Sequence, residues 1–255
     1  MAISFEQFRN DCPAAFAESP ASHVSDRYTF VRTCDVVAPM IESGFVIDEA
    51  RNVKAHKRNP LHGLHRVKLS HPDIAMTNGL RPQLIIHNSH NHASIFSAVV
   101  GMLRLVCTNG LVVGSVWGGI AFRHQRSSAY DVGNLLEQFS DLSRRAITTV
   151  DDWNTLELSD TQAGEYAARA ARLRFGEKVT LENPRELLST HRSEDDSNTL
   201  WTVYNRVQEN GTHGGIRFSG MRRRSRSLQG IMADTGFNRD LWNLTEEFAR
   251  EVSAG

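Results

Sequence analysis

The sequence has little cysteine, no net charge and no uniform basic character. Its three cysteines, Cys12, Cys34 and Cys107, are far apart and form no Cys-x-x-Cys pair, so neither a disulfide framework nor a cysteine-based zinc site is expected. Three reduced thiols in a cytoplasm are the simplest interpretation. The 29 basic residues balance the 29 acidic ones, which argues weakly against a dedicated nucleic-acid binder.

Long apolar segments are also missing. The longest stretch without charge lies between Arg104 and Arg123, and it contains glycines and an Asn-Gly pair that disfavour a membrane-spanning helix. The N-terminus carries Glu6, Arg9 and Asp11, unlike the positive-then-apolar layout of a signal peptide. We therefore expect a soluble cytoplasmic protein with no membrane partner.

Motifs for covalent or phosphate chemistry are absent from the sequence. There is no Gly-x-Ser-x-Gly elbow, no phosphate loop ending in Gly-Lys-Ser/Thr and no His-Glu-x-x-His pair. Cys107 lies beside an Asn-Gly turn on an apolar face, which favours packing over nucleophilic attack. We therefore expect no catalytic residue and no cofactor, and a binding protein is favoured over an enzyme.

The first half of the chain has the pattern of strands. β-Branched and apolar residues recur between Pro and Gly at 45–53, 65–70 and 81–88, and a shorter strand is predicted at 27–31. Helices are predicted at 5–16 and 35–42. Asn109-Gly110, between two apolar runs, predicts a type I′ hairpin turn, because that turn requires positive φ angles.

After Ser128 the apolar period changes from two to about 3.6, which is typical of amphipathic helices. A helix after Ser159 has a capping box with Gln162 and ends at Gly176. Further helices are predicted at 196–210, capped by Asp196 or Ser197, and at 238–252. The predicted fold is one α+β domain over 1–255. A β-rich basic half, 1–128, holds a mixed or antiparallel sheet with a central hairpin, and a helical half, 129–255, packs on it.

Charge is distributed unevenly along this neutral chain. Residues 51–126 carry ten basic residues and one acid, Asp73, whereas residues 131–200 carry fourteen acids and eight basic residues. An arginine-rich loop, near 211–230, follows several glycines and contains no acid. Single-strand binders combine a positive groove with aromatic platforms for bases. The predicted phosphate contacts and stacking residue are Arg104, Trp117, Arg123, Arg126, Arg222, Arg223, Arg224 and Arg226.

Each of these residues also has a structural interpretation. The arginine-rich loop could be a solvated segment that balances the acidic helices. Trp117, which shares one face of the predicted hairpin with Arg104, could be covered by a later helix.

The stretch HNSHNH at 87–92 raises the question of a metal site. On a continuing strand His90 and His92 would share one face and His87 would point to the other. A hydrolytic site needs three or more ligands, and Asp73 is the nearest carboxylate in sequence. His90 and His92 are therefore weak metal candidates, and hydrogen-bonded residues at a strand end are the alternative.

Several stretches together resemble a known family. They are NSH at 88–90, LRLVCTNGLVVG at 103–114, RLRFG at 172–176, DSNTLWTVYNRVQEN at 196–210, RSLQGI at 226–231 and FNRDLW at 237–242. The chain resembles the family called domain of unknown function 932 over about 25–250. The family pattern has an acid and a glycine after Asn-Ser-His, where this chain has Asn91 and His92. That departure weakens an enzymatic interpretation of the histidine stretch.

The resemblance implies a protein of phages, prophages and conjugative plasmids. Together with the charge layout it favours a non-enzymatic DNA-binding protein that assists annealing or recombination of single strands. Annealing proteins often form rings, so a homo-oligomer is compatible with this function. The alternatives are an inhibitor that binds a host defence protein through the acidic helical half, and a metal-dependent nuclease that uses the histidine-rich strand end.

Overall fold

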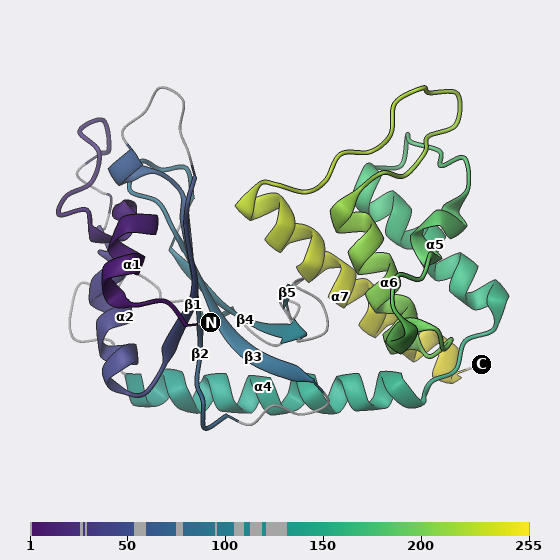
Figure 1. The fold of residues 1–255 in the computed structure, drawn as a ribbon, viewed down its shortest axis with the longest axis horizontal. Helices are drawn as coiled ribbons and strands as arrows, with labels where there is room; N and C mark the ends of the chain where they lie inside the picture. The colour runs from purple at the N-terminus through teal and green to yellow at the C-terminus, as the bar shows by residue number, and fades with distance from the viewer. Residues whose placement is uncertain are drawn as a thin grey trace. The chain divides into compact units, whose positions relative to one another are not determined.

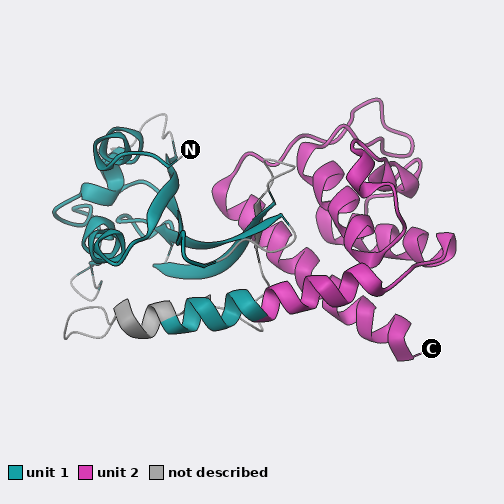
Figure 2. Ribbon diagram, turned by 60° about the horizontal axis from the view of Figure 1, so that its bottom comes forward, with its two compact units in different colours: residues 1–111, 117–144 teal, residues 112–116, 145–255 magenta. Residues whose placement is uncertain are grey.

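The computed structural model of the chain describes residues 2–25, 28, 30–53, 60–74, 79–94, 96–104, 110–112, 119–120 and 132–254 (Figure 1). The chain divides into two compact units (Figure 2). Unit 1 comprises the described residues of 1–111 and 117–144, and unit 2 those of 112–116 and 145–255. The fold is α+β, as predicted: strands lie in the N-terminal half, and most helices lie in the C-terminal half.

Unit 1 contains an antiparallel sheet built from consecutive strands. β1 (Val46–Asn52), β2 (His65–Ser70), β3 (Leu80–Asn88) and β4 (Ser97–Arg104) are neighbours in that order. β5 (Gly110–Val112) follows β4 in the sheet, and β6 (Gly119–Ile120) also pairs with β4. The strands predicted at 45–53, 65–70 and 81–88 are confirmed. The Asn109 turn position lies outside the described residues.

Short helices accompany this sheet in unit 1. α1 (Phe5–Asp11) is followed by a 3₁₀ helix, η1 (Pro13–Phe16), and then by α2 (Thr33–Glu42). Pro13 divides the helix predicted at 5–16, because proline has no N–H for the helical ladder. Ile3 forms an isolated antiparallel bridge with Ile47 of β1. Of the strand predicted at 27–31, the described residues 28, 30 and 31 lie in no strand.

The core of unit 1 lies where these helices meet the central strands. Phe8, Val36 and Val37 are fully buried, as are the β3 side chains Leu84 and Ile86. The antiparallel register places residue 67 opposite 86 and residue 84 opposite 100. β3 is buried along almost its whole length, so its polar residues Gln83, His87 and Asn88 are buried together with its apolar ones.

Unit 2 is helical. α4 (Val132–Thr155) contains the boundary between the units, and it is followed by α5 (Asp160–Phe175), α6 (Leu200–His213) and α7 (Ile231–Ala254). Two 3₁₀ helices, η3 (Pro184–Leu188) and η4 (Ser193–Asp195), connect α5 to α6. An aromatic cluster forms the core: Trp153 lies 4.6 Å from Trp242, and Trp201 stacks on Tyr204 at 5.5 Å, between ring centroids.

The helix boundaries follow local capping chemistry. The capping box of Ser159 and Gln162 is present, and α5 stops before Gly176 as predicted. α6 is capped by Thr199 rather than by Asp196 or Ser197, because the Thr199 hydroxyl accepts from the N–H of Thr202. α7 starts seven residues before the predicted 238. None of the helices in the described ranges is long and apolar enough to cross a membrane.

Candidate nucleic-acid interface

The arginine-rich segment 214–230 connects α6 to α7 in unit 2, and the backbone of this segment is hydrogen-bonded. The N–H of Gly215 donates to the carbonyl of Ser225 (2.9 Å), and the N–H of Ser225 donates to the carbonyl of Ile216 (2.8 Å). The N–H of Leu228 donates to the carbonyl of Thr212 (2.8 Å). The segment therefore doubles back on itself as a short hairpin, the arginine hairpin, 215–225. The sequence pattern alone predicts a free loop here.

Gly214 sets the close approach at the start of this hairpin. Its φ is +76°, a value that side-chain-bearing residues rarely adopt. A Cβ at this position would lie 2.6 Å from the carbonyl carbon of Arg226. Glycine is therefore required for both the backbone angle and the contact between the two ends of the hairpin.

A second segment packs alongside the hairpin. The N–H of Ser219 donates to the carbonyl of Thr180 (2.9 Å), and the N–H of Glu182 donates to the carbonyl of Arg217 (3.1 Å). Leu181 and Phe218 form an antiparallel bridge. The loop after α5 and the hairpin after α6, about forty residues apart in sequence, are thus held side by side in unit 2.

A pocket of about 470 Å³ lies between the end of α5 and the hairpin. None of its ten lining residues is acidic, and four of them are arginines. The lining consists of Arg174, Phe175, Val179, Phe218, Met221, Arg223, Arg224, Ser225, Arg226 and Ser227, and it is called the arginine pocket below.

Arg174 joins the two sides of the arginine pocket. Its Nε donates to the carbonyl of Gly211 (2.9 Å) and its Nη2 to the carbonyl of Arg226 (3.0 Å). Its guanidinium carbon lies 4.9 Å from the ring centre of Phe175 and 5.9 Å from that of Phe237. Burial lowers the pKa of Arg174 from its usual range. No carboxylate within the described residues forms an ion pair with it, so its positive charge is available to an anion.

Of the four arginines predicted in the arginine-rich segment, three line this pocket and one does not. Arg223, Arg224 and Arg226 are exposed lining residues, and Nη1 of Arg224 donates to the carbonyl of Gly215 (2.9 Å). Arg222 is also exposed but is not a lining residue.

The sequence missed Arg174, Phe175 and Phe218 as pocket residues. Phe175 and Phe218 meet at 5.3 Å between ring centroids. The signal that could have found them is an Arg-Phe pair followed closely by glycine, which occurs at 174–176 and again at 217–220.

The other predicted interface residues are Trp117, Arg123, Arg126 and Arg104. Trp117, Arg123 and Arg126 fall outside the described residues. Arg104, at the end of β4, is 7% exposed, a position that does not suit a phosphate contact at an open surface.

The basic residues of the sheet in unit 1 are largely balanced by carboxylates of β1. Glu49 lies 2.7 Å from Arg66 and 3.1 Å from Lys68, and Asp48 lies 3.8 Å from Arg81. Burial raises the pKa of Glu49, but Lys68 and Arg66 together hold that pKa below its usual range. These ion pairs therefore reduce the positive field that is expected from residues 51–126.

The histidine stretch belongs to a buried polar cluster in unit 1. β3 ends at Asn88, so His90 and His92 lie beyond the strand and the expectation that they share a strand face is wrong. Nε2 of His90 lies 2.9 Å from the carbonyl of Ala14, which requires the proton on Nε2. His90 is fully buried, and its Nδ1 has no hydrogen-bond partner within the described residues. His92 has a positive φ of 62° and packs its ring against Tyr28 at 4.9 Å.

Asn88 and His65 complete this cluster around Thr33. Nδ2 of Asn88 donates to the Thr33 hydroxyl (3.0 Å) and to the carbonyl of Val31 (2.8 Å). Nδ1 of His65 donates to the carbonyl of Gly63 (2.9 Å), which leaves Nε2 to accept from the Thr33 hydroxyl (2.8 Å). The Asn-Ser-His motif therefore hydrogen-bonds buried carbonyl and hydroxyl groups, and among its polar side-chain atoms Nδ1 of His90 is left without a partner within the described residues; this favours a structural role.

Burial also controls the titration of this cluster. It lowers the pKa of His65 to about 4 and that of His90 to about 4. Burial, together with Arg66 and Lys68, lowers the pKa of His87 to about 3. Across the parts of the chain that the structure describes, no group of three or more His, Cys, Asp or Glu side chains is placed to hold a metal ion.

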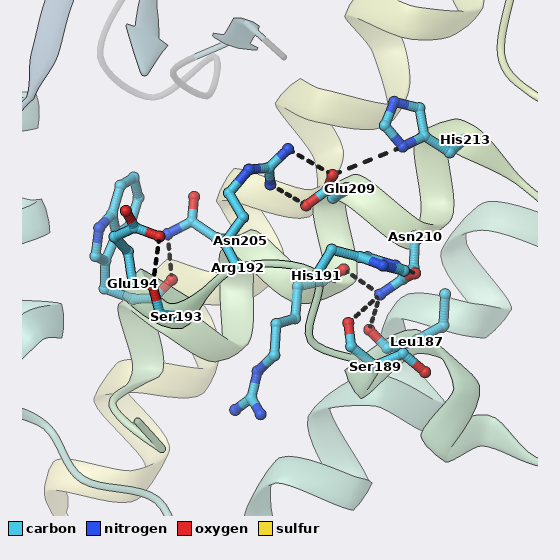
Figure 3. A network of polar contacts seen from close by, with 12 residues as sticks. Leu187, Ser189, His191, Arg192, Ser193, Glu194, Asn205, Glu209, Asn210 and His213 are labelled. Atoms are coloured by element: carbon cyan, nitrogen blue, oxygen red, sulfur yellow. Dashed lines mark hydrogen bonds and ion pairs between the residues drawn. The ribbon is translucent and has the colours of Figure 1, made fainter. Parts of the chain in front are cut away.

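A second polar network joins the C-terminal part of α6 to residues 187–192 (Figure 3). Arg192 forms a two-pronged ion pair with Glu209, one arm of which measures 2.8 Å. Nδ2 of Asn210 donates to the carbonyls of Leu187 (3.1 Å) and Ser189 (2.9 Å). Buried polar residues on α6 thus tie the helix to the segment before it.

The comparisons with known proteins concern nearly the whole chain. The model of the family described as Domain of unknown function (DUF932) matches residues 20–242. The chain belongs to this DUF932 family. It is 30% identical to UPF0380 protein YfjQ of Escherichia coli strain K12 over 254 residues, 98% of this chain and 93% of that protein. It is also 30% identical to UPF0380 protein YafZ of the same strain over 256 residues, with the same shares.

Membership of the DUF932 family confirms the resemblance predicted from the sequence. The matched range includes the Asn-Ser-His cluster, α5, α6 and the arginine hairpin, and extends into α7. No solved structure matches the chain.

Proposed function

We propose that the chain is a non-enzymatic DNA-binding protein of a phage or other mobile element, and that it binds single-stranded DNA through the arginine pocket. The observation that carries this proposal is the lining of that pocket. Four arginines, Arg174, Arg223, Arg224 and Arg226, converge there, and no lining residue is acidic. Guanidinium groups bind phosphate oxygens with two parallel N–H donors, which suits a nucleic-acid backbone.

The pocket favours an unpaired nucleotide over a duplex. Phe175 and Phe218 line it beside the arginines, and a base stacked on an aromatic ring contributes about 1–3 kcal/mol. Bases in a duplex are already stacked and paired, so only an unpaired base can enter a pocket of about 470 Å³. Assistance in strand annealing or recombination is compatible with this mode, because it leaves the base-pairing of neighbouring nucleotides free.

The test is a fluorescence anisotropy titration of a labelled single-stranded oligonucleotide at two salt concentrations. The test variant is Arg223→Ala/Arg226→Ala, because neither guanidinium forms a hydrogen bond or ion pair with another residue that the structure describes. The control variant is Arg222→Ala/Arg239→Ala, which removes the same number of positive charges. Neither of these two arginines lines the pocket, and Arg239 is paired with Asp240 at 2.7 Å.

Each lost charge-assisted contact should weaken binding about tenfold. Each should also reduce the slope of log affinity against log salt by about 0.7 for a single strand. The control variant should bind nearly as wild type does. Equal weakening in both double variants, or no binding of DNA by the wild type at low salt, would refute the proposal.

A further inference from the structure

The number of positive charges in the arginine pocket exceeds what one phosphate of a DNA backbone requires. A phosphodiester carries one negative charge, whereas a phosphomonoester carries about −1.5 to −2 at pH 7 because its second pKa is about 6. Three arginines come from one four-residue stretch, 223–226, and Arg174 comes from the end of α5. A groove that follows a strand spreads its cations along the backbone, but this pocket gathers them at one place.

Arg174 strengthens the argument because it is held in position before any ligand binds. Two of its nitrogens donate to the carbonyls of Gly211 and Arg226, and its plane lies near the ring of Phe175. Its Nη1 has no protein acceptor within the described residues and remains able to donate to an anion. Arg174 is half-buried, so water screens its charge less than at an open surface, and an oxygen group with two negative charges attracts it more strongly than one with a single charge.

We infer that the arginine pocket takes a phosphomonoester, namely the terminal phosphate of a DNA strand with its end nucleotide. This inference rests on the proposed function and names the part of the strand that the pocket binds. The volume of about 470 Å³ suits one nucleotide, with its base against Phe218 or Phe175 and its terminal phosphate among the arginines.

The experiment compares three oligonucleotides of one sequence, labelled at an internal position: one with a 5′-phosphate, one with a 3′-phosphate and one with hydroxyl groups at both ends. Anisotropy titrations use the full chain. Either the 5′-phosphorylated or the 3′-phosphorylated oligonucleotide should bind at least about tenfold more tightly than the oligonucleotide with hydroxyl ends, because the extra charge adds at least one charge-assisted hydrogen bond. Arg223→Ala/Arg226→Ala should remove this preference, and the charge-matched control Arg222→Ala/Arg239→Ala should keep it.

Competition identifies the source of the phosphomonoester. Thymidine monophosphate and inorganic phosphate are added to the complex of the chain with the preferred oligonucleotide. If the ligand is a strand end, thymidine monophosphate and inorganic phosphate should each compete only at concentrations far above that of the oligonucleotide. Competition by the mononucleotide at equal concentration would keep the phosphomonoester but overturn the strand end as its source.

The outcomes separate the two proposals. Equal affinity for all three oligonucleotides, with binding still lost in Arg223→Ala/Arg226→Ala, overturns the terminal-phosphate inference and leaves single-strand binding standing. A terminal-phosphate preference that survives this double substitution overturns the assignment to the arginine pocket. Absence of binding to any oligonucleotide overturns both.

Discussion

Acidification should destabilise unit 1 through its buried histidines. His65 and His90 are neutral in the folded chain, because burial lowers the pKa of each to about 4. An unfolded histidine has a pKa of about 6.5. Between pH 6.5 and pH 4 the unfolded chain therefore binds more protons than the folded chain, and the free energy of unfolding falls as pH falls. The stability is complete above pH 6.5 and is lost progressively toward pH 4.

The size of the effect follows from these two pKa values. At pH 5 the unfolded histidine is almost fully protonated and the folded one is about one-tenth protonated. The difference corresponds to about 2 kcal/mol per histidine relative to pH 7.5. His87, with a pKa of about 3 in the folded chain, adds to the loss in the same direction.

Hydrogen exchange of peptides from β2 and β3 measures this loss where it arises. Tryptophan fluorescence reports mainly on unit 2, because three of the four tryptophans, Trp153, Trp201 and Trp242, lie there. The variant His90→Gln keeps a side-chain N–H that can donate to the carbonyl of Ala14 but cannot titrate. Its opening free energy should fall by about 2 kcal/mol less than that of wild type between pH 7.5 and pH 5.

His213→Gln is the matched control, because the same substitution is then made at an exposed site on α6 in unit 2. It should leave the pH dependence of the β2 and β3 peptides unchanged. If His90→Gln lost protection with the same pH dependence as wild type, the buried neutral state of His90 would be refuted.

Two further predictions concern unit 2. Gly214→Ala should destabilise unit 2 by about 1–3 kcal/mol in urea unfolding followed by tryptophan fluorescence, since the new Cβ would lie 2.6 Å from a backbone atom. Gly220→Ala should cost less, because Gly220 also has a positive φ, +70°, but no atom lies within 4 Å of its added Cβ. Equal costs for the two substitutions would contradict the steric argument. Glu209→Gln should cost about 2–3 kcal/mol in the same assay, because it leaves the guanidinium of Arg192 with a weakened partner in a mostly buried pair. The exposed pair of Arg169 and Glu251 supplies the comparison: Glu251→Gln should cost less than Glu209→Gln, because solvent screens an exposed pair, and a larger loss at Glu251 than at Glu209 would refute the ranking by burial.

The strands and helices were largely predictable because their signals are local. Apolar residues between Pro and Gly marked β1 to β3, and the capping box at Ser159 marked the start of α5. The main error among the helices was at residue 13. The apolar spacing over 5–16 predicted one helix, but Pro13 cannot donate to the α-helical hydrogen-bond ladder, so the segment divides there.

Charge was harder to predict, since charges that are distant in sequence meet in the sheet. Counting from residue 51 gave a strongly basic segment, but the acids that balance it, Asp48 and Glu49, lie just outside that count on β1. Strand register, rather than composition, decides which cations remain available.

The arginine pocket was predicted only in part for a related reason. Arg223, Arg224 and Arg226 are conspicuous as a run, whereas Arg174 comes from the end of another helix. Their meeting depends on hydrogen bonds between segments about forty residues apart, such as that between Ser219 and Thr180. No periodicity within either segment encodes that contact.

The bridge between Ile3 and Ile47 has a consequence for how copies of the chain meet. β1 is a terminal strand of the sheet, and a terminal strand exposes unpaired N–H and C=O groups that can recruit a strand from another molecule. Ile3 occupies part of this row, and the register shift between Ile47 and Glu49 interrupts it further. The first few residues thus protect the molecule against sheet-to-sheet aggregation, and shortening the chain at this end would remove that protection.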